Sequence, residues 1–462
     1  MNEQTSRMTR LLLATMIPSF AVISTMAMFA VAVPQIRADF GLTEDVAAWL
    51  VVAYTLPFMA LMPLYGRFGD LIGRRGVLAA GLLLFAAGSA MLLVPSDLSF
   101  VLLARAVQGA GAAGVNPLAM SLIIEHTPGV RRGTALGTWN SAGPISGMVG
   151  PIIAGPIIDA VGWRAIMVPS VVATVVAAFL VARLIPSDRP RPPGARRAAV
   201  MTFDWAGVIL FNVAVGLLVF YTSSRPVTGV DPLTDWRLAL GAGAVGAGFL
   251  WWQSRARRPF FDLTVFRNRN FSFASICVSI RMMLLGGVNL LVPLFLTDLF
   301  DFPAAATGAV ISLHAVGLLV TMRIGGHVID RYRSRLQIIA GLLIESLAML
   351  LLVLMPLEPS LGLTLAAVAL HGMGAGLCLA ALHLFALGTV SKERSATAAG
   401  LYSMVRFAGS LFGAAIGGVV LYVGIAEHGA TVPGYTPAFL LYLAISIAGA
   451  AAALGLTRRL PG

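Results

Sequence analysis

The sequence predicts an all-α polytopic membrane protein, and three observations support this fold class. Apolar residues make up 58% of the 462 positions and charged residues only 11%, with a mean hydropathy of +0.88. Soluble domains carry about 25% charged residues, so this chain has too few charges to cover its surface in water. The apolar residues also form long uninterrupted runs, and arginines gather in every second loop between them.

The apolar runs predict fourteen transmembrane helices. A bilayer core about 30 Å thick needs roughly 20 helical residues to cross it. The runs at 205–221 and 237–253 are the shortest, and the count would be twelve without them. Continuous runs differ from the alternating pattern of a transmembrane β-barrel. The predicted spans are 9–34, 46–65, 77–94, 98–123, 133–159, 164–185, 205–221, 237–253, 271–297, 307–329, 336–356, 361–388, 396–424 and 437–457.

The basic residues set the orientation of these spans. With a cytoplasmic N-terminus, 24 of the 32 lysines and arginines fall in inside segments and four in outside segments. Cytoplasmic loops of membrane proteins carry such an excess of positive charge. We therefore expect both termini in the cytoplasm. The net charge of +12 marks this face of the membrane and does not indicate nucleic-acid binding.

Two long inside loops, 186–204 and 254–270, divide the sequence into three parts. The first loop is rich in proline and reads as a linker. The predicted domains are an N-terminal six-helix bundle at 1–185, a linker with an inserted two-helix pair at 186–258, and a C-terminal six-helix bundle at 259–462.

A loop motif occurs once in each six-helix part. The pattern G-x3-D-x4-R starts at Gly66 and again at Gly326, 260 residues later. A six-helix unit used twice in parallel orientation is one repeat architecture of secondary transporters. We expect these loops to hold the two halves together in one state and release them in another, although topology charges alone would explain the arginines. The predicted gate residues are Gly66, Asp70, Gly73, Arg74, Arg75, Gly326, Asp330 and Arg335.

Several segments resemble a known family. The segment from Gly66 to Leu78 resembles the signature loop of the major facilitator superfamily, and Leu102 to Gly111 resembles its span-4 motif. The segments 203–207, 259–271 and 406–413 are similar to motifs of the fourteen-span drug:proton antiporters of the EmrB/QacA type. The residues Gly143, Gly147, Gly150, Pro151 and Gly155 resemble the helix-packing motif of span 5 in antiporters.

This resemblance covers nearly the whole chain and implies a major facilitator fold. It also implies a secondary active transporter of the bacterial inner (plasma) membrane, which exports small amphipathic compounds by alternating access, as in multidrug efflux. One departure matters, because Thr25 stands where the group usually carries an acidic residue in span 1. Proton coupling is therefore open, and the alternatives are an uncoupled exporter of a neutral or anionic metabolite and a non-transporting sensor.

Ionisable groups inside spans are costly and need a reason. Four arginines and Glu345 lie there, together with His314, His371 and His383. The excess of positive charge favours neutral or anionic substrates. Glu345, His371 and His383 are candidates for proton coupling. Glu345 lies on a span expected to be peripheral, where a paired or interfacial role is the simpler one, and packing is the simpler role for the two histidines. The predicted substrate-cavity residues are Thr25, Arg105, Gln108, Asn116, Trp139, Asn140, Arg281 and Asn289.

An enzyme is the competing class, and the sequence argues against it. No aqueous loop carries a nucleophile, a metal-ligand cluster or a phosphate-binding glycine loop for ATP. We expect no cofactor and no metal, with a proton gradient as the energy source if transport is coupled. The expected partners are a small-molecule substrate and the lipid bilayer, with no nucleic acid, and the chain is expected to function as a monomer.

Overall fold

The computed structural model describes most of the chain as helix. The described residues are 2–94, 97–127, 135, 138–186, 201, 204–222, 224–230, 235–256, 263–332, 334–390 and 395–458, without the side chains of 2–8, 70, 226–227, 330 and 395–397. Within these ranges, thirteen helices are long and apolar enough to cross a membrane. A fourteenth, α12 (Trp236–Arg255), has the length but is less apolar than the others. The all-α polytopic prediction is confirmed.

Helix contacts divide the chain into two compact units. Unit 1 holds residues 1–32 and 53–203, and unit 2 holds residues 33–52 and 204–462. The boundary therefore passes through α1 (Asn2–Phe40) and α2 (Glu44–Ile72), so that the hairpin between them belongs to unit 2.

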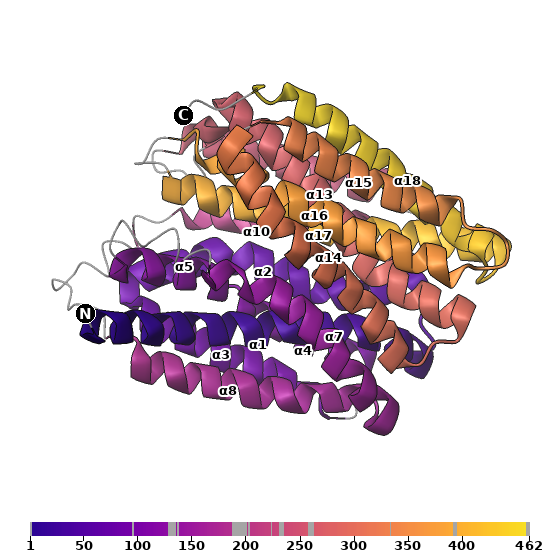
Figure 1. The fold of residues 1–462 in the computed structure, drawn as a ribbon, viewed down its shortest axis with the longest axis horizontal. Coiled ribbons are helices and arrows are strands. Elements are labelled where there is room, and N and C mark those ends of the chain that lie inside the picture. Colours follow the sequence, from indigo (N-terminus) through magenta and orange to yellow (C-terminus); the bar gives the residue numbers. More distant parts are fainter. Residues whose placement is uncertain are drawn as a thin grey trace. The chain divides into compact units, whose positions relative to one another are not determined.

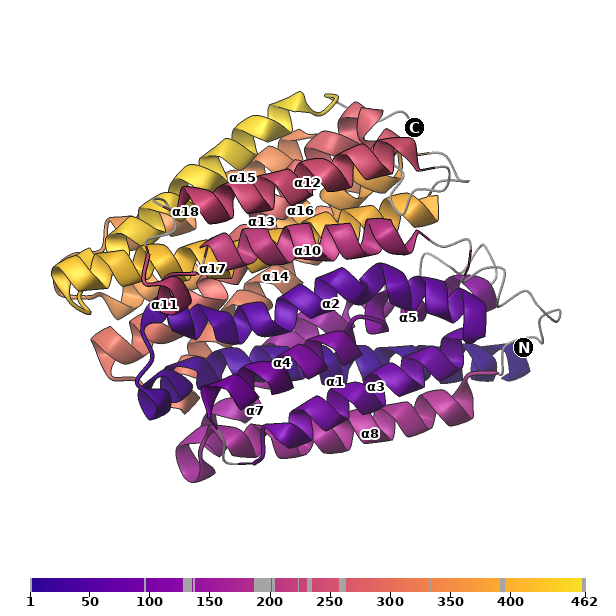
Figure 2. The ribbon, with the colours of Figure 1, turned by 180° about the vertical axis from the view of Figure 1, so that it is seen from behind.

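Unit 1 contains the greater part of α1 and α2 and the helices that follow them. Within it α3 packs against α4 and α8, and both views show α3 running beside α8 (Figures 1 and 2). The remaining elements of unit 1 are α3 (Arg74–Met91), α4 (Leu98–Ala112), α5 (Val115–His126), α7 (Ala142–Val161), η2 (Trp163–Ile166) and α8 (Met167–Leu184).

The predicted span 98–123 is not one regular helix. It starts at Asp97, whose carboxylate accepts a hydrogen bond from the Phe100 amide at 2.8 Å. A turn at Ala113–Gly114 then separates α4 from α5. Pro117 explains the break, because proline has no amide hydrogen for the carbonyl four residues earlier, which is that of Ala113.

Unit 2 contains the inserted pair and the last six long helices. Helix α12 packs against α10, as Figure 2 shows, and the carboxylate of Asp204 accepts hydrogen bonds from Trp252 and Gln253 at the far end of that pair. The elements are α10 (Trp205–Thr222), α11 (Arg225–Thr228), α12, η3 (Leu263–Arg267), α13 (Arg269–Phe300), α14 (Ala304–Tyr332), α15 (Leu336–Val353), α16 (Leu361–Leu387), α17 (Ser395–His428), α18 (Val432–Ala452) and η5 (Ala453–Gly455).

The two six-helix halves repeat the same close helix contacts. A Cβ on Gly109 would strike the Tyr54 carbonyl, and one on Gly372 would strike the His314 carbonyl. The carbonyl residues are 260 positions apart and the glycines 263. The internal repeat predicted from the loops therefore extends to the way helices cross inside each unit.

Candidate functional site

A buried arginine organises the polar interior of unit 1. Arg105 on α4 is 2% exposed, and its Nη1 donates a hydrogen bond to Gln108 Oε1 at 2.8 Å. The guanidinium lies 3.8 Å from the ring centre of Phe29 and 4.6 Å from that of Tyr54. Gln108 in turn donates to Ser89 on α3 at 2.8 Å. The structure thus brings two predicted cavity residues, Arg105 and Gln108, into one network with two aromatic faces.

Thr25, which stands where the resembling group usually has an acidic residue, lies at the contact between α1 and α8. Its side chain is 1% exposed, and the hydroxyl donates to the Ala21 carbonyl at 2.8 Å on its own helix. The same hydroxyl lies 2.9 Å from Ser170 Oγ on α8. Thr25 therefore joins α1 to α8 and is separate from the Arg105 network in its hydrogen bonding.

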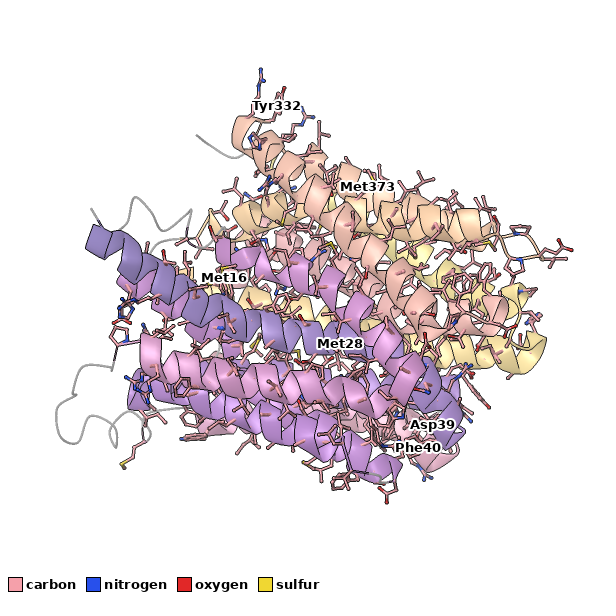
Figure 3. All side chains as sticks on the ribbon, turned by 60° about the horizontal axis from the view of Figure 1, so that its bottom comes forward. Met16, Met28, Asp39, Phe40, Tyr332 and Met373 are labelled. Atoms are coloured by element: carbon pink, nitrogen blue, oxygen red, sulfur yellow. The ribbon has the colours of Figure 1, made fainter. Side chains whose placement is uncertain are left out.

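The other predicted cavity residues of unit 1 are dispersed. Trp139 is buried, and its indole nitrogen donates to Ser19 Oγ at 2.9 Å. It packs in an apolar cluster that Met16 of α1 also contacts, and Figure 3 places Met16 on that helix. Asn140 is exposed, and Asn116 is partly exposed. Because the turn at Ala113–Gly114 intervenes, the regular helical face predicted to join Asn116 to Arg105 is interrupted.

In unit 2, a set of ionisable side chains from four helices converges around Arg281 on α13. Arg281 is 4% exposed and lies within electrostatic range of His314, Glu345 and His371. Its Nη2 contacts the Met282 sulfur at 3.3 Å, whereas Nε and Nη1 find no hydrogen-bond partner in the described chain. Buried donors of this kind are rare and call for an explanation.

Glu345 on α15 is the buried acid of this set. It is fully buried, and neither carboxylate oxygen accepts a hydrogen bond from a described residue. The stem of the side chain lies against α16, since a Cβ on Gly374 would come within 2.8 Å of the Glu345 Cγ. The paired or interfacial role expected from the sequence stays a prediction, since no described residue donates a hydrogen bond to the carboxylate while Arg281 lies within electrostatic range.

His314 and His371 form a hydrogen-bonded pair between α14 and α16. Their Nδ1 atoms are 3.0 Å apart, and the ring centres are 4.8 Å apart with planes tilted by 34°. His371 is 1% exposed and its Nε2 has no described hydrogen-bond partner, whereas His314 is partly exposed. His314 is one of the histidines predicted to lie inside a span, but it is not among the residues predicted to couple protons. The glycines at Gly372 and Gly376, with small-residue spacing, could have indicated the close α14–α16 contact.

The remaining predicted residues of unit 2 lie outside this pair. His383, also on α16, contacts the Leu379 carbonyl through Nδ1 at 2.8 Å, and its ring centre is 5.4 Å from that of Tyr402. Asn289 is partly exposed, eight residues beyond Arg281 on α13.

The internal repeat shows that the titratable set belongs to one half only. At offsets of 260 and 263 residues, His314, Glu345 and His371 in unit 2 correspond to Tyr54, Phe85 and Gln108 in unit 1. The first half thus has aromatic and amide side chains at these positions. The second half has two histidines and a carboxylate there, which can bind and release protons.

The two motif loops differ in the contacts of their arginines. In the first loop, Arg74 Nη1 pairs with Glu125 at 2.6 Å, and Gly73 adopts a φ of +111° before α3. In the second, Arg335 Nη1 donates to the carbonyls of Leu454 and Leu456 at 2.5 and 2.7 Å, at the end of α18 and η5. The side chains of Asp70 and Asp330 lie outside the described set, Arg75 makes a further interaction, and Gly66 and Gly326 have open space around them.

Among the span-5 residues, Gly150 makes the closest helix contact. A Cβ there would lie 2.8 Å from the Ser24 carbonyl on α1, whereas one on Gly143 would meet only Ile23 at 3.9 Å. Pro151 and Gly155 are buried on the same helix, and Gly147 is partly exposed.

A polar network at the α1–α2 hairpin, which we name the hairpin clasp, was missed by sequence analysis. Arg37 pairs with Asp298 of α13 and with Glu44 at 3.2 Å. Tyr435 donates to Asp298 Oδ2 at 2.6 Å. Because these residues are far apart in sequence, hydropathy gives no signal for them. The clasp comprises Arg37, Glu44, Asp45, Arg225, Asp298 and Tyr435.

The inserted pair contributes to this clasp through the connection between its helices. Arg225 of α11 pairs with Asp45 at 2.7 Å, and Asp45 is 1% exposed. The Arg225 guanidinium also lies 3.5 Å from the ring centre of Tyr422 on α17. The insert is thereby joined to both the hairpin and the C-terminal helices of unit 2.

Known proteins resemble this chain along most of its length. The Major Facilitator Superfamily model matches residues 15–414 and 271–462. The multidrug resistance protein Stp of Mycobacterium tuberculosis is 30% identical over 412 residues, which is 89% of this chain and 75% of Stp. A probable actinorhodin transporter of Streptomyces coelicolor is 28% identical over 409 residues, which is 85% of this chain and 68% of that protein.

Solved structures share the fold. A bacterial homolog of the human lysosomal transporter Spinster, in an inward-facing conformation, has a TM-score of 0.68 at 15% identity and covers 100% of this chain and 99% of its own. At that identity the likeness concerns the fold alone. The family match, the bacterial multidrug relative and the thirteen apolar helices among the described residues identify the chain as a multi-pass, non-enzymatic transporter of the plasma membrane. The chain belongs to the Major Facilitator Superfamily.

Proposed function

We propose that this transporter exports small amphipathic compounds, neutral or anionic, in exchange for protons, and that Glu345 carries the proton. The observation that supports this most strongly is the environment of Glu345. It is a fully buried carboxylate with no described hydrogen-bond partner, within electrostatic range of a buried arginine. A carboxylate is costly to bury in its charged form without hydrogen bonds, whereas the protonated form is cheaper to bury. Such a group favours a cycle in which it alternates between the two forms.

The interaction between Arg281 and Glu345 depends on whether Glu345 is protonated. When Glu345 is deprotonated, the two residues are opposite charges in a medium of low dielectric constant and attract each other. When a proton neutralises Glu345, the attraction disappears and Arg281 is left as an uncompensated positive charge. Exchange requires proton and substrate to occupy the site in turn, so in this proposal the substrate binds while Glu345 is deprotonated, with its polar group held by the Arg281 guanidinium and the Glu345 carboxylate. Protonation of Glu345 removes the charged carboxylate from this site and releases the substrate. Protonation and substrate binding would in this way be linked through one arginine.

The substrate class is inferred from charge and from relatives. Two arginines, Arg105 and Arg281, are buried in spans, one in each unit, and Glu345 is the buried carboxylate within electrostatic range of Arg281. The buried acids at the start of α2, Glu44 and Asp45, are already paired with Arg37 and Arg225. Arg105 also lies against two aromatic faces, which suits flat apolar groups. One relative is named for multidrug resistance and another for transport of actinorhodin, which supports export of small organic molecules. The energy source in this proposal is the proton gradient, with no cofactor.

The proposal is tested by measuring probe uptake into liposomes in which the cytoplasmic face of the transporter points outward. Three probes would be compared: ethidium as a cation, Nile red as a neutral compound and carboxyfluorescein as an anion. With an acidic interior, the wild type should accumulate the neutral or anionic probe. Glu345→Gln should lose gradient-driven accumulation by about tenfold or more, since tenfold corresponds to only 1.4 kcal/mol. It should still exchange labelled for unlabelled probe, because exchange needs no net proton movement.

The matched control is Glu358→Gln, the same change at an exposed carboxylate between α15 and α16. It should behave as wild type. Wild-type transport that is indifferent to the pH gradient would favour the uncoupled facilitator. A clear preference for ethidium would contradict the proposed substrate charge, and a lack of flux for every probe under every gradient would favour a non-transporting sensor.

A further inference from the structure

The hydrogen-bonded pair of His314 and His371 is not used in the coupling proposed for Glu345. We propose that His314 and His371 form a two-residue relay that delivers protons to Glu345, with His314 as the residue of entry. This inference rests on the proposed function, in which Glu345 carries the proton. It assigns a role to His314, which takes no part in the proposed charge interaction between Arg281 and Glu345.

The geometry of the pair matches a relay. The two Nδ1 atoms are 3.0 Å apart, which is the separation of a hydrogen bond. Gly372 makes this approach feasible, because its missing side chain leaves α16 resting on the His314 carbonyl of α14. Thr321 reinforces the crossing by donating to the Met373 carbonyl at 2.8 Å, and Figure 3 labels Met373.

Hydrogen-bond chemistry requires one proton between the two rings. A neutral imidazole has one donor nitrogen and one acceptor nitrogen. If His314 donates through Nδ1, its Nε2 is an acceptor, and His371 carries its own proton on Nε2. A proton that binds His314 at Nε2 lets the Nδ1 proton pass to His371 Nδ1, and His371 then releases the proton from Nε2. Each ring forms one N–H bond and breaks one.

Exposure falls along the proposed path. His314 is partly exposed, His371 is 1% exposed and Glu345 is fully buried. The His371 Nε2 atom, which would release the proton, has no hydrogen-bond partner in the described residues. Gly374 lies three residues after His371 on α16, and the Glu345 stem lies against it. Glu345 is therefore the buried acid next to the turn of α16 that follows His371.

The charged and titratable groups around the pair come from neighbouring helices. Arg281 of α13 acts on both histidines and on Glu345. Four further buried titratable groups on α16 and α17 lie within electrostatic range of Arg281, namely Cys378, His383, Tyr402 and Arg406. His383 makes its contacts with Leu379 and Tyr402, so its ring belongs to a separate contact.

The test follows the arrival of the proton and needs no transported compound. Full-length protein in nanodiscs is subjected to a rapid drop in pH, and the infrared band of a protonated carboxyl is followed in time. The component that disappears in Glu345→Gln reports Glu345. In His314→Gln and in His371→Gln this component should appear about 100-fold more slowly than in wild type, since a positioned proton-transfer group contributes 10² or more. Its final amplitude should remain.

The matched control is His327→Gln, which changes an exposed histidine of α14. It should protonate Glu345 at the wild-type rate. Equal rates in His314→Gln, His371→Gln and wild type would overturn the relay. If the relay variants are slow but Glu345→Gln still transports with the gradient, the coupling proposal fails and the relay stands. A wild type without the Glu345 component would overturn both.

A second measurement observes the histidine pair in the wild-type protein and uses a substitution only to assign the signal. In wild-type protein labelled with ¹⁵N-histidine, NMR should detect one protonated and one unprotonated Nδ1 with a scalar coupling across the hydrogen bond. Its assignment would come from loss of the signal in His371→Gln. Two protonated Nδ1 atoms without mutual coupling would contradict the relay.

Discussion

Gly372 of α16 lies directly against the main-chain carbonyl of His314 on α14, and this contact sets the distance between the two histidine rings. Gly109 and Tyr54 repeat it in the first half, but without a titratable pair. The same helix crossing thus serves an aromatic–amide environment in unit 1 and a proton-binding environment in unit 2. This difference is the basis of the proposed coupling.

Substitution of Gly372 by alanine should separate α14 from α16. Overpacking of a tight core costs about 1–3 kcal/mol, because a Cβ at this position meets backbone that cannot rotate away. Thermal unfolding in detergent measures the loss of stability. Gly400→Ala on α17 is the control, since its Cβ would enter open space, and it should be neutral or stabilising by about 0.5–1 kcal/mol. Equal melting temperatures for the two variants would contradict the packing account.

The span-5 glycines should differ from one another. Gly150→Ala introduces a Cβ 2.8 Å from the Ser24 carbonyl, and we expect a loss of about 1–3 kcal/mol in stability together with slower transport. Gly143→Ala meets only a flexible Ile23 side chain and should resemble wild type in stability. If Gly143→Ala proved the more damaging, the motif would act through something other than α1–α7 packing.

The hairpin clasp predicts a stabilising role for the inserted pair. Arg225→Ala leaves the buried Asp45 carboxylate without its ion-pair partner, which we expect to cost about 1–3 kcal/mol. Asp45→Asn should cost a similar amount. The double variant should lose less than the sum, because removing both charges avoids an unpaired buried charge. Additive losses in thermal unfolding would show that the pair contributes no mutual stabilisation.

Restoring the acid of the family at position 25 should destabilise this protein. Thr25 is 1% exposed and packs against Ser170, so Thr25→Asp buries a carboxylate at a helix contact. We expect a cost of about 3 kcal/mol or more at neutral pH, and a smaller cost at acidic pH, where the neutral carboxyl is cheaper to bury. Thr25→Ser retains the hydroxyl and serves as control. Melting temperatures of Thr25→Asp that do not rise relative to the control as the pH falls would contradict this.

Much of the fold could be predicted because hydropathy is a local signal. The spans, the helix pair and the repeated loop all follow from stretches of about 20 residues. Hydropathy predicted the span 98–123 but not its interruption at Ala113–Gly114, because that break depends on one proline, Pro117, inside an otherwise apolar run. That break interrupts the face assumed to join Asn116 with Arg105.

The site was predicted less fully because its contacts are distant in sequence. His314 and His371 are separated by 57 positions, and Arg37 and Asp298 by 261. Composition identified the rare ionisable residues inside spans but not which of them meet. Arg335 illustrates the difficulty, since its motif suggested a gate between halves whereas its side chain bonds carbonyls within unit 2. The gate role, the domain boundaries and the monomeric state stay predictions.

The most direct test of the central claim measures proton movement itself. Liposomes containing the transporter and an internal pH indicator receive Nile red or carboxyfluorescein on the outside without an imposed gradient. The account predicts that probe entry drives protons out, so the interior becomes alkaline with the wild type and stays at constant pH with Glu345→Gln, while Glu358→Gln matches wild type. Probe entry with the same pH change in Glu345→Gln as in wild type would contradict it.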